Sequence, residues 1–211
     1  MKKFLVLLAM SAFLFGGCNF GAPYFHSNNK LYEITDTLTI SNSVADIQLD
    51  SQILMWPDMA KLKKDIRYAI ARNVKEMRIN INCPGGAVFA MLDIMDQLQK
   101  VKNMGIKLST HAEGVVASAA VPIYLMGEKR TMSERAWIMI HAHSGRSTPY
   151  NADSENKMVE EFTYRMAMSI FLNTNMTWQQ IMKHCDTNKN QRTDALYLNK
   201  GDAELLGFTT E

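Results

Sequence analysis

Apolar residues along the chain follow two spacings, one typical of strands and one typical of amphipathic helices. Apolar positions at every second residue predict a strand, and positions three and four residues apart predict a helix with one buried face. Strands are predicted at 32–40, 77–81, 107–111 and 137–140. Helices are predicted at 58–72, 87–104, 154–172 and 177–184, and a strand or turn followed by a small helix at 197–208. Strands that alternate with helices in this way predict an α/β domain with a parallel sheet.

The longest predicted helix, 154–172, has a continuous apolar stripe. On an isolated subunit we expect this stripe to be exposed, and a large exposed apolar surface marks a site of interaction. The stripe therefore predicts a contact between subunits. Its members are Met158, Val159, Phe162, Met166 and Ile170.

The beginning of the chain follows a different pattern. Two lysines precede an uncharged apolar run at 4–15, which small residues and Cys18 close. This is the layout of a secretory signal peptide, and the run is shorter than the roughly 20 residues that cross a bilayer. We expect a signal peptide at 1–17, a polar tether at 18–30 and the folded domain at 31–211.

The cysteine at this boundary resembles that of a bacterial lipoprotein signal. In such signals the cysteine is lipidated and becomes the new N-terminus, so Cys18 is the predicted lipidation site. Phe15 departs from the motif, which usually has a smaller aliphatic residue three positions before the cysteine. We expect an exported lipoprotein, anchored to a membrane in the cell envelope or periplasm. An uncleaved N-terminal membrane anchor and ordinary secretion are the alternatives.

Composition and charge exclude several classes of protein. With 47% apolar and 21% charged residues the chain is neither disordered nor a multi-span membrane protein. The formal net charge of +2 comes from the two lysines at the N-terminus, and no basic stripe follows, so nucleic acid is not an expected partner. The histidines are scattered, and we predict neither a metal site nor a cofactor. Cys83 and Cys185 give no disulfide pattern, and we expect both to be unpaired.

Three short motifs could carry chemistry. Asn82–Gly86 is a Pro-Gly-Gly turn between a strand and a helix, and such a turn exposes backbone N–H groups that can bind an oxyanion. Ser118 is the single serine or threonine of the apolar stretch 114–125, and His141 directly follows the strand 137–140. Taken one at a time, a simple turn, a buried serine bonded to the backbone and a surface histidine are the commoner explanations.

Together and in this order, the motifs resemble those of the peptidase subunit of the Clp protease, a serine protease of the ClpP/crotonase fold. The resemblance extends over 79–208. It implies that Ser118 is the nucleophile and His141 the general base, and that the backbone N–H groups of Gly86 and Ala119 form the oxyanion hole. The family usually has methionine where this chain has Ala119, but the donor is a backbone group, so its chemistry is retained.

The same resemblance places the acid of a catalytic triad shortly before Tyr197 and Leu198. Counting back without gaps reaches Ala195, and Asp194 lies one position away. We therefore assign Asp194 as the acid that orients the histidine. Asp186 is the alternative, and a dyad without an acid is the third possibility.

The resemblance further implies a fold of repeated β-β-α units with a projecting handle helix at 154–172. It also implies a homo-oligomeric ring with the active sites inside. The expected function is an exported, membrane-anchored serine endopeptidase that hydrolyses peptides or unfolded proteins. The alternatives are a non-catalytic ring or scaffold subunit and a crotonase-like enzyme acting on acyl-coenzyme A.

Overall fold

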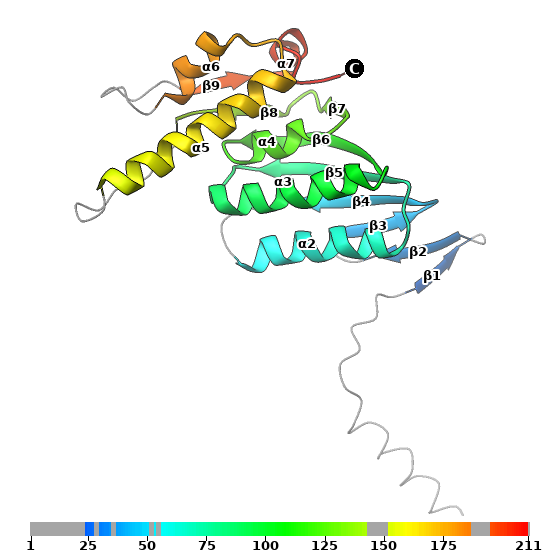
Figure 1. Cartoon of the computed structure of the whole chain (residues 1–211). Coiled ribbons are helices and arrows are strands. Elements are labelled where there is room, and N and C mark those ends of the chain that lie inside the picture. The colour runs from blue at the N-terminus through cyan, green and yellow to red at the C-terminus, as the bar shows by residue number, and fades with distance from the viewer. Residues whose placement is uncertain are drawn as a thin grey trace, which may run out of the picture.

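The computed structural model describes residues 24–27, 30–34, 37–50, 53, 56–142, 152–186 and 195–210, which form one large sheet and a set of helices (Figure 1). The strands are β1 (Tyr24–Ser27), β2 (Lys30–Ile34), β3 (Leu38–Ser41), β4 (Val44–Leu49), β5 (Glu76–Cys83), β6 (Lys107–Ala117), β7 (Lys129–Met132), β8 (Trp137–Ile140) and β9 (Leu196–Leu198). The helices are α2 (Trp56–Ala71), α3 (Val88–Asn103), α4 (Ala120–Leu125), α5 (Ala152–Asn173), α6 (Trp178–Cys185) and α7 (Lys200–Leu205).

The centre of the sheet is parallel and its two ends are antiparallel. The strand order is β1-β2-β3-β4-β5-β6-β8-β9, and β4, β5, β6 and β8 run parallel. β7 and β8 both pair with β6: residues 109–112 of β6 pair with β7, and 115–117 pair with β8. The α/β fold with a parallel central sheet is as the sequence predicts.

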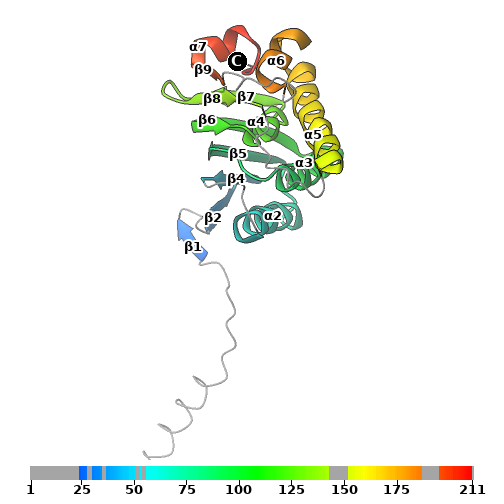
Figure 2. The same ribbon diagram turned by 90° about the vertical axis from the view of Figure 1, so that its left-hand side faces the viewer.

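The helices α2 to α5 cover one face of the sheet (Figure 2). Strand β5 shows why that face forms the core, since Met77, Ile79 and Ile81 alternate with polar residues and are fully buried. The residues between them face the other side of the sheet, because successive side chains of a strand point to opposite faces.

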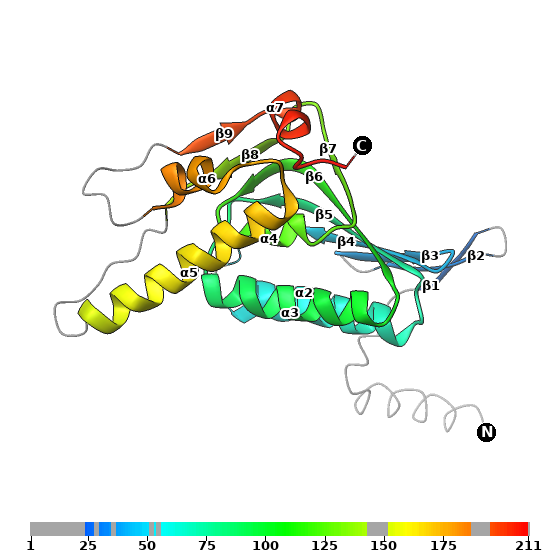
Figure 3. The ribbon, with the colours of Figure 1, turned by 45° about the horizontal axis from the view of Figure 1, so that its top comes forward.

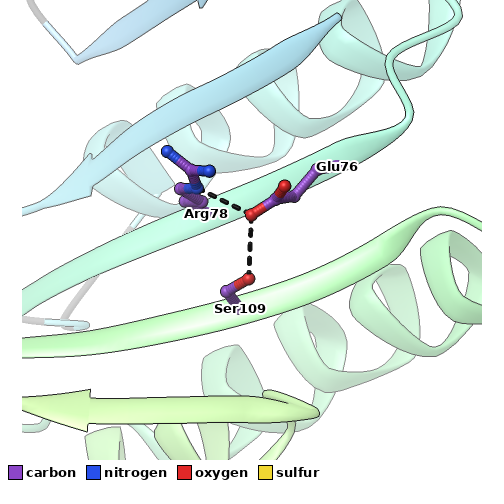
Figure 4. A network of polar contacts seen from close by, with 3 residues as sticks. All are labelled: Glu76, Arg78 and Ser109. Carbon is purple, nitrogen blue, oxygen red and sulfur yellow. Dashed lines mark hydrogen bonds and ion pairs between the residues drawn. The ribbon is translucent and has the colours of Figure 1, made fainter.

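That other face carries polar contacts between neighbouring strands. Glu76 accepts a hydrogen bond from Arg78 Nε at 2.7 Å and one from Ser109 Oγ at 3.2 Å (Figure 4). The hydrogen bond from Arg78 is the main reason that the pKa of Glu76 is lowered. The alternation of side chains along β5 and β6 therefore gives the sheet one buried apolar face and one polar face.

Helix α5 projects from the body of the molecule as the expected handle does (Figures 1 and 3). Its apolar stripe is nevertheless not a free surface: Phe162, Met166 and Ile170 are 8%, 9% and 0% exposed within the chain itself. The helix packs on α4 and α6, and these residues are covered by that packing. The expectation that the whole stripe joins subunits is thus wrong for these three residues.

Away from these buried residues, α5 carries exposed apolar side chains. We call this set the outer face of α5: Tyr164, Phe171 and Leu172, all of which are exposed. Met158, a member of the apolar stripe, is exposed as well. The rings of Tyr164 and Phe171 each contact Trp178 of α6, at 5.8 Å and 6.0 Å between centroids.

One buried cation fixes the C-terminal end of α5. The Arg130 guanidinium donates hydrogen bonds to the backbone carbonyls of Asn173, Gly207, Phe208 and Gly127. Backbone carbonyls are hydrogen-bond acceptors that can satisfy a buried guanidinium. Arg130 therefore joins β7 to the end of α5 and to the C-terminal segment.

The N-terminal strands differ from the expectation. Part of the segment expected to be a tether, Tyr24–Ser27, is strand β1 and pairs antiparallel with β2. The single strand predicted at 32–40 is divided between β2 and β3, which pair with each other. No helix in the described ranges is long and apolar enough to cross a membrane.

Candidate active site

Ser118 lies at a sharp turn between β6 and α4. Its φ is +55°, in the left-handed region that residues other than glycine seldom adopt. Its backbone N–H donates to the carbonyl of Met139 on β8 at 2.8 Å. Such strained strand-to-helix turns are typical of nucleophilic serines, because they present the side chain at the end of the sheet.

His141 is brought to Ser118 by the register of two parallel strands. Ala117 pairs with Met139, so the residue two positions after Met139 arrives beside the turn that contains Ser118. Both side chains line one pocket with a volume of about 20 Å³. The lining residues are Val88, Met91, Ser118, Ala119, His141, Phe162, Thr163 and Met166.

Ser118 and His141 line the same pocket, but the structure shows no hydrogen bond between their side chains. Within the described part of the chain, the ring of His141 makes no hydrogen bond and no ion pair. Catalytic hydrogen bonds are often long or misaligned in free enzymes and shorten when the substrate binds. The structure thus brings the predicted nucleophile and the predicted base to one pocket, without a hydrogen bond between them.

Gly85 packs directly against Ser118. Its φ is +101°, and a Cβ atom at this position would lie 2.7 Å from Ser118 Cβ and 3.1 Å from the backbone nitrogen of Ala119. Only a residue without a side chain allows the Pro-Gly-Gly turn to approach this closely.

Gly86 holds the turn against Ile53, and its own amide is left free. Ile53 N–H donates to the carbonyl of Gly85 at 2.7 Å, and Ala87 N–H donates to the carbonyl of Ile53 at 2.6 Å. In such a parallel bridge the N–H of the middle residue points away from the partner strand. Among the described residues the backbone N–H groups of Gly86 and Ala119 make no hydrogen bond. Two unused N–H groups next to a serine can bind a developing oxyanion.

The acid is not located. Asp194 lies outside the described residues, as do Cys18 and His143. Asp186 directly follows α6, is partly buried, and is not hydrogen-bonded to His141.

The two remaining cysteines are free and buried. Burial raises the pKa of Cys83, and it raises that of Cys185 to about 12. A thiol reacts as its thiolate, so neither cysteine is a competing nucleophile at neutral pH.

Sequence reasoning missed Thr163 and Gly85 as members of the site. Thr163 interrupts the apolar side of α5 next to Phe162, and a hydroxyl on a buried helix face is the signal that could have identified it. For Gly85 the available signal is the pair of adjacent glycines, in which the sequence analysis assigns a role only to Gly86.

Comparisons with known proteins identify the family and the fold. A family model described as Clp protease matches residues 30–198. A solved structure of a ClpP1 mutant from Listeria monocytogenes is similar to the chain with a TM-score of 0.67 and 23% identity, over 79% of this chain and 89% of that one. No match was found among curated proteins.

Proposed function

The chain belongs to the Clp protease family, and from this premise we propose that it is a serine endopeptidase acting through Ser118, His141 and Asp194. The observation that carries the proposal is the small pocket in which Ser118 and His141 meet beside two unused backbone amides. We propose peptides and unfolded proteins as its substrates.

Each residue has one role in the proposed reaction. His141 takes the proton of the Ser118 hydroxyl as Oγ attacks the scissile carbonyl, and later gives this proton to the leaving amine. The amides of Gly86 and Ala119 stabilise the oxyanion of the tetrahedral intermediate. Asp194 would hold the imidazole in the tautomer that accepts the proton.

A non-catalytic ring or scaffold subunit is the second candidate. It is favoured by one observation, the missing hydrogen bond between Ser118 and His141 in the described part of the chain. An acyl-coenzyme A enzyme of the same fold would use the oxyanion hole but needs no serine nucleophile, so the position of Ser118 argues against it.

Hydrolysis assays separate these functions. The purified protein is incubated with a fluorogenic peptide and with an unfolded protein, both without ATP, because ATP is not available outside the cell. We expect both to be cleaved, and a folded protein to be left intact. Failure to cleave either substrate, by protein that is folded and assembled, would favour the scaffold.

We propose that the protein is exported and anchored to the membrane through lipidated Cys18. Replacement Cys18→Ser is expected to move the protein from the membrane fraction to a soluble or unprocessed form, because the lipid is attached to this thiol. Phe15→Leu, which brings the sequence closer to the lipoprotein motif, serves as the control and should leave the protein in the membrane fraction. Mass spectrometry that finds unmodified Cys18 within an intact N-terminus would disprove the anchor.

The proposed assembly is a homo-oligomeric ring that uses the outer face of α5. Tyr164→Glu is expected to break it into smaller species, because burying an unpaired charge at a contact is costly. Tyr164 is 53% exposed in the isolated chain, so the subunit itself should stay folded. Light scattering gives the mass of the species formed by this variant, by the wild type and by the control variant Tyr197→Glu.

Tyr197→Glu is the matched control, because Tyr197 is 60% exposed but lies on β9 of the sheet. It should leave the assembly intact. Dissociation by Tyr197→Glu alone would move the contact from α5 to the sheet, and a monomeric wild type would end the proposal.

A further inference from the structure

Thr163 on α5 is a buried polar residue without a partner. Its side chain is 5% exposed, and its Oγ1 atom has no hydrogen bond. In the described part of the chain it shares this property only with Gln48 Oε1 on β4. A threonine within a helix can bond to a carbonyl of the preceding turn, but this one does not.

An unpaired buried hydroxyl lowers stability, so each such group needs an explanation. For Thr163 the explanation lies in its position. It lines the same pocket as Ser118 and His141, whereas Gln48 does not. The rest of that pocket is apolar, apart from the backbone of Ala119.

The size of the pocket suggests what Thr163 binds. A cavity needs roughly 10–15 Å³ to hold one water molecule, which also requires two to four polar partners. The volume here is about 20 Å³, and the polar side chains on its wall are Ser118, His141 and Thr163. The pocket is therefore large enough for one water molecule, and all three of these polar residues line it.

We propose that Thr163 positions the water that hydrolyses the acyl-enzyme. The inference rests on the proposed function, because it concerns the second half of that reaction. The water donates one hydrogen bond to His141 and the other to Thr163 Oγ1, which leaves an oxygen lone pair directed at the acyl group on Ser118.

Deacylation proceeds through a second tetrahedral intermediate. The water oxygen forms a bond to the carbonyl carbon of the acyl-serine ester, and its proton passes to neutral His141. The tetrahedral intermediate then collapses, the bond between this carbon and Ser118 Oγ breaks, and the proton passes from His141 to Oγ. The products are a carboxylic acid and free Ser118, and Thr163 neither gains nor loses a proton.

Burst kinetics with p-nitrophenyl acetate test the inference. The acetyl group is too small to fill the pocket with a side chain, and release of nitrophenol reports acylation before deacylation. In Thr163→Val we expect the burst rate to stay within twofold of wild type. The steady-state rate should fall by about tenfold, the effect of one ordinary hydrogen bond. Intact mass spectrometry should then find the acetylated enzyme accumulating.

Two further variants complete the design. Thr163→Ser keeps the hydroxyl and should restore the steady-state rate, whereas Thr163→Ala should behave as Thr163→Val and replaces it if the valine variant does not fold. Valine has the shape of threonine without the unpaired hydroxyl, so we expect its thermal unfolding temperature to be unchanged or higher.

The outcomes separate this inference from the proposed function. If the wild type shows no burst and no labelling of Ser118 by a fluorophosphonate, the proposed function fails, and the inference with it. If the wild type is labelled and the valine variant deacylates at the normal rate, the inference alone is wrong. Equal losses in burst and steady-state rates would show a role in substrate binding or packing and would also overturn it.

Discussion

Ser118→Ala is expected to abolish peptide hydrolysis while the fold is kept. In a well-studied serine protease, loss of the serine lowers kcat about a millionfold, and a residual rate on the order of 10³-fold over water comes from the oxyanion hole and binding. The substitution removes one hydroxyl from a turn that is held by backbone bonds, including that from Ser118 N–H to Met139. Turnover of a fluorogenic peptide and thermal unfolding measure the two effects.

Ser133 provides a matched control for this variant. Its Oγ lies 3.0 Å from His111 Nε2, so it is a second serine paired with a histidine, on the opposite face of the sheet. Ser133→Ala should hydrolyse the peptide at the wild-type rate. Unchanged turnover in Ser118→Ala would remove Ser118 from the mechanism, and loss of activity in Ser133→Ala instead would transfer the role to the His111 pair.

Asp194→Asn is expected to keep the fold and to lower turnover by about 10⁴-fold. This is the size of the effect when an asparagine replaces the acid of a serine protease, because the imidazole is then held in the wrong tautomer. The steady-state rate with the same peptide measures it.

Asp186→Asn is the control for the acid and should be nearly silent. The described part of the structure shows no hydrogen bond between Asp186 and His141, and the acid of a triad orients the imidazole by hydrogen-bonding to it. If Asp186→Asn lost turnover and Asp194→Asn kept it, the role of the acid would pass to Asp186. Full activity in both variants would indicate a dyad of Ser118 and His141 without an acid.

Most helices and the central strands β5 and β8 were predictable because their burial is regular, whereas the central strand β4 and the short helix α4 were not predicted. α2, α3, α5 and α6 begin and end within two residues of the predicted ranges, and β5 and β8 show plain alternation. β7 was missed because it is short and one of its two buried residues is Arg130, whose guanidinium is satisfied by carbonyls far along the chain. With Met132 as its only other buried residue, β7 has no run of alternating apolar residues for a pattern to identify.

The apolar stripe of α5 shows a second limit of periodicity. The spacing of Phe162, Met166 and Ile170 correctly predicts that they are buried, but it cannot tell packing within a subunit from packing between subunits. The structure covers these residues with the chain's own helices and leaves Tyr164 and Leu172 exposed on the other side.

The site was predictable only in part, for a similar reason. Ser118 and His141 were found through a resemblance, and their proximity depends on the register of Ala117 with Met139, which no local pattern encodes. The role of Gly85 depends on the approach of two turns that are distant in sequence. Thr163 depends on which side of α5 faces the pocket.

The central claim is that Ser118 is a nucleophile activated by His141. Covalent labelling with a fluorophosphonate, followed by mass spectrometry of the digested protein, tests it most directly, because the adduct identifies the reacting oxygen. The account predicts one adduct, on Ser118, which is lost in His141→Ala although that variant remains folded. An adduct on another residue such as Ser133, or folded wild-type protein that is not labelled at all, would contradict it.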